Sequence, residues 1–197
     1  MNRKLLRATL AGLVLLVAAG AALPWLLSVV GVKVTLQQPQ TSAPQPEFRS
    51  GACRVPGVGT TIVVDFGPES NKPTLVRCAL GFGQSKTDTG WRLFEATGIP
   101  VAGTTQYPTG FVCRVAGYPS EASQTCDSTP TEAEGTWVYF SSDTQSAIHE
   151  TWRFRMQGAE MTHPSCGSWE GWRFVTPNDG PNDRVPRVKP EPIACIY

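Results

Sequence analysis

Six cysteines constrain this chain more than any other feature of its sequence. All of them follow an apolar N-terminal segment, and none forms a Cys-x-x-Cys pair, so the spacing of a zinc ribbon is absent. An even set of this kind indicates three disulfides, which form in an oxidising compartment. The count alone leaves many connectivities open. The cysteines are Cys53, Cys78, Cys113, Cys126, Cys166 and Cys195.

The elements expected around the cysteines favour one pairing. The strand that carries Cys113 leads directly into a Pro/Gly-rich loop that contains Cys126, so this pair closes a short loop. Cys53 precedes the first expected strand, and Cys78 lies in the expected hairpin partner of that strand. The remaining two cysteines then hold the C-terminal tail. The predicted pairs are Cys113–Cys126, Cys53–Cys78 and Cys166–Cys195.

The N-terminus has the pattern of a signal peptide or a membrane anchor over residues 1–36. Three basic residues stand among the first seven, and no charged residue occurs in Ala8–Val32. This apolar run of about 25 residues is long enough for a spanning helix, which favours a retained anchor. The sequence Ala19–Ala21 resembles a cleavage site and leaves secretion open. In either case the positive-inside rule places the rest of the chain outside the cytoplasm. Residues 37–51 are polar and predict a solvated linker.

Between residues 52 and 176, short alternating runs predict strands with one helix among them. In Thr61–Phe66, alternate apolar residues predict a half-buried strand, and Thr74–Leu80 is close enough to complete a hairpin. Thr87–Gly98 predicts the helix, with Asp88 as its N-terminal cap and Gly98 at its end. The later strands are expected at 111–115, 136–141, 151–157 and around residues 172–174.

The predicted fold is therefore an α+β domain with a mainly antiparallel sheet, one helix and disulfide staples, preceded by an apolar helix. In Thr151–Gln157, Trp152, Phe154 and Met156 are expected on the core face and the residues between them in water. Residues 177–197 are rich in Pro and Asn and predict an irregular tail over the surface.

No catalytic set stands out. The two histidines, His149 and His163, lack the spacing of a zinc protease, and no nucleophile elbow, phosphate-binding loop or dinucleotide motif is present. We therefore expect no enzymatic activity, no metal and no cofactor. The net charge of +1 is unlike that of a nucleic-acid-binding protein.

Large aromatic residues gather in the last third of the chain and are the candidates for ligand binding. Tryptophans on strands most often belong to the core, yet this density also suits an apolar groove. Trp169 stands in a loop-like Gly-Ser-Trp-Glu-Gly context and is the best single candidate. Arg153, Arg155 and Arg173 suit either an anion site or a solvated strand face. The ligand-binding candidates are Trp137, Tyr139, Trp169 and Trp172.

Several of these segments together resemble a known group of proteins. The matching segments are Thr61–Phe66, Arg77–Ala79, Gly98–Ile99, Gly110–Gly117, Cys126 with Pro130, Thr136–Tyr139 and Gly167–Phe174. Their order resembles actinobacterial exported proteins of unassigned function, which are similar to the transcobalamin C-terminal-like domain. The resemblance implies a β-grasp-like α+β fold, and such proteins are often encoded beside energy-coupling-factor transporters for vitamins or cobalt.

The chain departs from this group at two places. A histidine that usually follows the aromatic stretch is missing after Gly135–Ser141, and Cys166 stands where the group usually has no cysteine. In transcobalamin the corresponding domain covers one side of a corrinoid, so a changed aromatic cluster implies a changed specificity.

The expected function is a non-catalytic binding or accessory module, exported and tethered to the membrane by its N-terminal segment. Its expected partners are a small vitamin-like molecule or a transporter subunit. The alternatives are an envelope protein with a structural or interaction role and no small ligand, and, ranked last, a secreted hydrolase.

Overall fold

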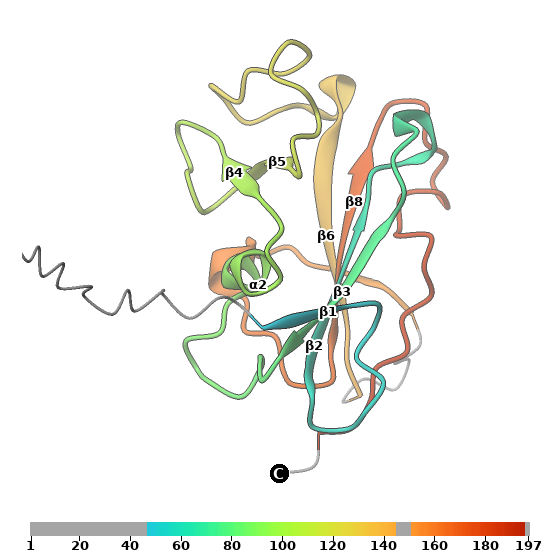
Figure 1. Ribbon diagram of the computed structural model, residues 1–197. Coiled ribbons are helices and arrows are strands. Elements are labelled where there is room, and N and C mark those ends of the chain that lie inside the picture. The colour runs from blue at the N-terminus through green and yellow to red at the C-terminus, as the bar shows by residue number, and fades with distance from the viewer. Residues whose placement is uncertain (1–46, 145–150, 196–197) are drawn as a thin grey trace, which may run out of the picture. The chain divides into compact units, whose positions relative to one another are not determined.

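The computed structural model of the chain describes residues 47–144 and 151–195 (Figure 1). The expected apolar helix within residues 1–36, most of the expected linker and His149 lie outside these residues. In the part of the chain that is described, no helix has the length and apolar character needed to cross a membrane.

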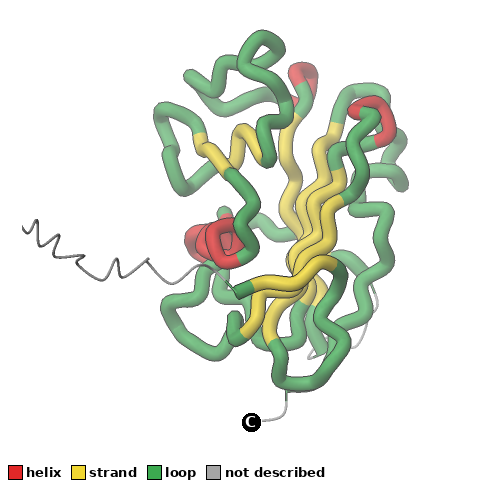
Figure 2. The backbone as a smooth tube through the Cα atoms, viewed as in Figure 1, coloured by secondary structure: helices red, strands yellow, loops and turns green. Residues whose placement is uncertain are grey.

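A six-stranded sheet forms the centre of the described region, in the order β1-β3-β2-β8-β6-β7 (Figure 2). All neighbouring strands run antiparallel except β2 and β8, which are parallel. The prediction of a mainly antiparallel sheet with one helix is confirmed. The strands are β1 (Phe48–Ser50), β2 (Gly59–Asp65), β3 (Leu75–Leu80), β6 (Thr136–Ser142), β7 (Arg153–Phe154) and β8 (Trp169–Val175).

Strand β1 belongs to the segment expected as a linker. Phe48–Ser50 pair with β3, and the guanidinium of Arg77 lies 4.7 Å from the centre of the Phe48 ring. This contact and the free edge of β3 explain why three residues of a polar segment join the sheet. The domain therefore begins before residue 52.

The hairpin of β2 and β3 was predicted correctly, but the half-buried character of β2 was wrong. Ile62 and Val64 enter the core as expected, yet every residue of Gly59–Asp65 is buried. The strand lies between β3 and β8, and other parts of the chain cover both of its faces. In this strand the alternation therefore separates the residues that face the apolar core from those that face the second covering layer, and both sets are buried.

One helix, α2 (Gly90–Ala96), packs on one face of the sheet beside the small sheet of β4 (Val101–Gly103) and β5 (Val112–Val115) (Figure 1). Leu93 and Phe94 are fully buried in the core between helix and sheet. Thr89 caps the helix by accepting a hydrogen bond from the backbone N–H of Arg92. The prediction that Asp88 is the cap was wrong.

Asp88 instead holds the preceding loop. Its carboxylate accepts hydrogen bonds from the backbone N–H groups of Gly83 and Ser85. Asp88 and Thr89 both directly precede the helix, and both residue types can cap a helix or hydrogen-bond to the backbone of a loop. The sequence therefore does not show which of the two is the cap.

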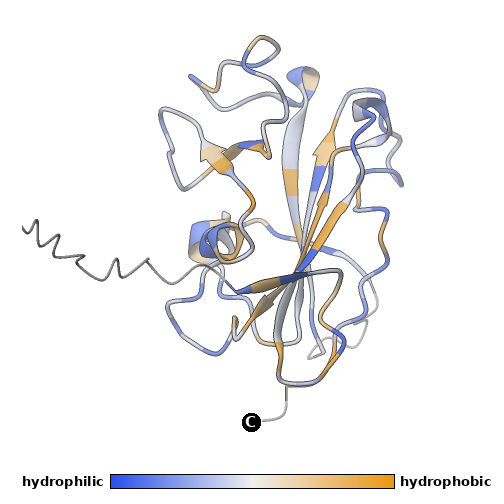
Figure 3. Cartoon of the chain, in the orientation of Figure 1, coloured by the Kyte–Doolittle hydropathy of each residue, from blue (hydrophilic) through white to orange (hydrophobic). Residues whose placement is uncertain are grey.

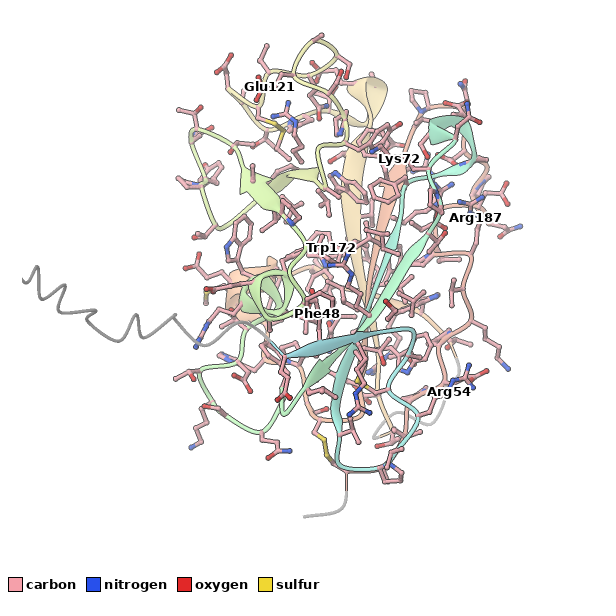
Figure 4. The ribbon with its side chains drawn as sticks, viewed as in Figure 1. Phe48, Arg54, Lys72, Glu121, Trp172 and Arg187 are labelled. Carbon is pink, nitrogen blue, oxygen red and sulfur yellow. A yellow bond between two sulfur atoms is a disulfide. The ribbon has the colours of Figure 1, made fainter. Side chains whose placement is uncertain are left out.

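The irregular segment after Val175 covers the opposite face of the sheet. Asp65 of β2 is fully buried there, and Arg187 donates hydrogen bonds to both of its carboxylate oxygens. Burial alone would raise the pKa of Asp65, but its bonds from Arg187 and Gly67 lower the pKa overall. In Figure 4, Arg187 and Trp172 lie on opposite sides of the sheet.

The three disulfides join the cysteines in the expected pairs. The Cα–Cα distances are 4.9 Å for Cys53–Cys78, 5.8 Å for Cys113–Cys126 and 5.6 Å for Cys166–Cys195. The described cysteines therefore include no free thiol. Three disulfides indicate an oxidising, extracytoplasmic environment. Hydrophobic residues are frequent along the sheet, and the surrounding loops are more polar (Figure 3).

The strand expected over residues 151–157 is reduced to the two residues of β7. It pairs with β6 at Phe140 and Ser141, at the end of the sheet, and the backbone N–H of Arg155 donates to the backbone oxygen of Tyr139 at 2.9 Å. Phe154 is 63% exposed and Met156 is 92% exposed, so the prediction that they belong to the core was wrong. An edge strand this short has no second layer to cover its apolar side chains.

Candidate functional site: a groove with an aromatic floor

The structure separates the four candidate aromatics into two groups. Register pairs Tyr139 of β6 with Trp172 of β8, and Trp137 with Phe174, so these side chains share the helix-facing side of the sheet. Trp169 is three residues before Trp172 on the same strand and therefore points to the opposite face. The four residues do not form one cluster.

Trp169 begins strand β8, and its interpretation as a loop residue was wrong. Its side chain is 3% exposed and lies edge-on to Trp152, with ring centres 6.4 Å apart. The indole N–H of Trp152 in turn donates to the backbone oxygen of Val188 in the tail. Trp169 thus packs between the sheet and the layer that covers it.

The other three aromatics form a packed layer between the sheet and its cover. The rings of Tyr139 and Trp172 stack with centres 4.5 Å apart and planes 10° apart, and Phe94 packs against Trp172. Trp137 donates its indole N–H to the backbone oxygen of Tyr118. Each of the three is at most 5% exposed, so their first role is to stabilise the core.

A groove of ≈ 400 Å³ lies above this layer. Trp137, Tyr139 and Trp172 contribute to its floor, while residues 110–112 and 154–159 form much of its walls. Phe154 and Met156 belong to the second wall, but the Phe154 ring packs edge-on to Phe140, the residue with which it pairs, and so points to the sheet face opposite the Tyr139 ring. A concave, mostly apolar surface of this size is typical of small-molecule sites.

A buried polar network underlies the aromatic floor. Glu170 of β8 is 2% exposed and accepts hydrogen bonds from the hydroxyl of Tyr139 at 2.6 Å and from that of Ser168 at 3.2 Å. The Tyr139 hydroxyl also lies 2.9 Å from that of Thr162. Gly90 of α2 approaches so closely that a Cβ there would lie 2.5 Å from the Tyr139 oxygen. A residue larger than glycine at position 90 would therefore displace either the helix or the Tyr139 hydroxyl.

Burial dominates the acid–base properties of this network. It raises the pKa of Glu170 to about 7, although the Tyr139 hydroxyl, the charge of Arg155 and the Ser168 hydroxyl all act in the opposite direction. Burial and the nearby Glu170 also raise the pKa of Tyr139 well above its usual value. The buried carboxyl group of Glu170 therefore changes its protonation state near neutral pH.

Arg155 is the one charged residue in the lining of the groove. The two other arginines expected with it lie elsewhere: Arg153 pairs with Asp143, and Arg173 is buried against Asp179. The arginines thus form no common anion site, and only Arg155 faces the groove.

A second hollow of ≈ 220 Å³ lies in the loop of residues 122–134. Its lining includes Asp127 and Glu134 and is more polar than that of the groove. Among the described residues, no group of histidine, cysteine and acidic side chains is arranged to hold a metal ion. His163 is exposed, and its Nδ1 lies 3.3 Å from the backbone oxygen of Asp88.

Sequence reasoning missed Glu170 and the exposed wall of the groove. A signal for Glu170 was available, because it alternates with Trp172 and Phe174 and must share their face if the segment is a strand. No comparable signal marks Phe154 and Met156, since their exposure depends on where the sheet ends.

Comparison with known proteins returned no match among family models, curated proteins or solved structures.

Proposed function

We propose that this chain is an exported, non-catalytic binding module whose groove takes up a small, largely apolar ligand. The observation that carries the proposal is the groove of ≈ 400 Å³ with Trp137, Tyr139 and Trp172 beneath it and residues 154–159 in its wall. Isolated exposed apolar residues are common, but Met156, which is 92% exposed, belongs to the wall of a concave apolar surface.

The location of the module is proposed from two features. Three disulfides support a site outside the cytoplasm. The apolar, positively flanked residues 1–36 support export, with retention as a membrane anchor. We therefore propose that the groove acts at the outer face of a membrane.

The strand order supports a β-grasp-like character. A hairpin (β2, β3) is followed by a helix, by the separate β4–β5 sheet and by three further strands of the main sheet, and the last strand, β8, lies parallel to β2 between β2 and β6. The resemblance to transcobalamin C-terminal-like domains implies a β-grasp-like fold, and we propose that this strand order belongs to that class. On that basis a transporter subunit is the proposed destination of the captured ligand.

The test is direct titration of the full chain, with its disulfides intact, against a panel of vitamins and tetrapyrroles. Tryptophan fluorescence reports binding because Trp137 and Trp172 lie beneath the groove. We expect Met156→Ser to weaken binding several-fold by removing one apolar side chain from the wall. Met161→Ser is the matched control, because Met161 is 70% exposed and lies outside the groove lining.

Equal loss of binding in both methionine variants would contradict the groove as the binding site. If no member of the panel binds the wild-type chain, but crosslinking on native membranes joins the Phe154–Met156 wall to another protein, the module is an interaction protein without a small ligand.

A further inference from the structure

Three buried polar atoms without a hydrogen-bond partner belong to residues that line the groove. They are Oγ1 of Thr136, Nε of Arg155 and Nε1 of Trp172, and none has a partner among the residues that the structure describes. A buried donor without an acceptor costs roughly 1–3 kcal/mol, so its presence calls for an explanation. Nε of Arg155 and Nε1 of Trp172 are obligate donors, but both are covered even in the empty groove. The terminal nitrogens of Arg155 are not among these buried atoms, so they are the donors that an acceptor oxygen of a ligand in the groove can reach.

The charge of the groove is also uncompensated. Arg155 is its one charged lining residue, its side chain is only partly buried, and it forms no ion pair with any residue in the described ranges. The acid whose charge interacts with that of Arg155 is Glu170, which is buried and accepts hydrogen bonds from the Tyr139 and Ser168 hydroxyls. The guanidinium of Arg155 is therefore available to pair with an anionic group of a ligand.

Building on the proposed function, we propose that the ligand is a hydrophobic acid, bound with its anionic carboxylate on Arg155. The apolar body of the ligand lies over the aromatic floor and contacts Met156 at the wall. The flexible thioether of Met156 adapts to bodies of different shape, so the acid group provides the more stringent part of the recognition. A neutral compound with the same body lacks the charge-assisted hydrogen bond and binds more weakly.

The test uses a pair of probes that differ only in charge: dansyl-labelled undecanoic acid and its methyl ester. Each is titrated into the full, oxidised chain at neutral pH, and binding is followed by dansyl fluorescence. We expect the wild-type chain to bind the acid about tenfold more tightly than the ester, as expected for one charge-assisted hydrogen bond. Arg155→Gln should remove this preference and leave the affinity for the ester within about twofold.

Arg153→Gln is the matched control. Arg153 is two residues away, carries the same charge and pairs with Asp143 outside the groove lining, so its replacement should preserve the preference for the acid. Arg155→Lys gives a second measurement should the glutamine variant fold poorly, because it keeps the charge and should retain part of the preference.

The possible failures are distinct. Equal affinity of the wild-type chain for acid and ester overturns the role of Arg155 but leaves the groove as an apolar binding site. A preference for the acid that survives in Arg155→Gln also overturns the inference, because the anion then binds elsewhere. Absence of binding by both probes overturns this inference and the proposed uptake of small apolar ligands together.

Discussion

At the scale of single residues, Glu170 is a carboxylic acid buried among aromatic rings, with its pKa raised to about 7. It stands on the helix-facing side of β8, the side it shares with Trp172 and Phe174, and is 2% exposed. The Tyr139 and Ser168 hydroxyls satisfy its oxygens, so the carboxyl group is tolerated in an aromatic core. Its position beneath the groove also couples the protonation of the core to the charge of Arg155.

The raised pKa of Glu170 has a defined effect on stability. Its usual pKa is 4.5 and its pKa in the folded chain is about 7, so between these values the folded state holds a proton that the unfolded state has lost. The contribution of Glu170 to the free energy of unfolding therefore falls as pH rises through this window, by about 3 kcal/mol, and is constant above it.

We expect Glu170→Gln to remove this fall, because an amide does not titrate. Urea unfolding on either side of the window measures it: the variant should gain stability relative to wild type at the higher pH and not at the lower. Glu95→Gln, at an exposed position of α2, should follow the wild-type profile. A variant with the full wild-type pH dependence would show that another group is responsible.

At the scale of elements, helix α2 shows how local signals specify a short helix. The helix has only seven residues, which is too short to be stable alone, and its burial of Leu93 and Phe94 holds it on the sheet. Its N-terminal cap is Thr89, whose side chain satisfies one of the backbone N–H groups that the first turn leaves unpaired.

Thr89→Ala should lower the free energy of unfolding by about 1 kcal/mol through loss of this cap. Thr89→Ser keeps a hydroxyl and should retain most of the stability. Thermal unfolding of both variants and of the wild-type chain measures these differences in stability. Equal stability of alanine and serine at this position would assign the cap no role.

The strands show where sequence reasoning succeeds and where it ends. The strands β2, β3, β6 and β8 were predicted from the sequence, and in β2 the alternation correctly marks Ile62 and Val64 as the residues that enter the core. The same pattern failed at β7, because alternation does not reveal that a strand lies at the edge of a sheet and leaves Phe154 uncovered. The sequence therefore does not predict the groove, although it predicts three of the floor residues, Trp137, Tyr139 and Trp172, as ligand-binding candidates.

At the scale of the described region, the sheet has two differently built covers. Helix α2 and the small β4–β5 sheet cover one face with apolar side chains. The irregular tail covers the other through Arg187 on Asp65 and the backbone oxygen of Val188 on Trp152. Gly171 permits this approach, because a Cβ there would lie 2.7 Å from Trp152 and 2.9 Å from Pro186. The tail has no periodic pattern, so the sequence does not predict this second layer.

The tail layer depends on one staple near its end, Cys166–Cys195. Replacing both cysteines by serine should lower the free energy of unfolding by about 3 kcal/mol. It should also speed hydrogen exchange in residues 187–193 and make Trp169 more accessible to acrylamide, because the tail then opens locally without global unfolding. The matched control replaces Cys113 and Cys126, whose loss should destabilise the chain without selectively loosening the tail. Slow exchange in the tail of the first variant would mean that Arg187 and Trp152 hold the layer without the disulfide.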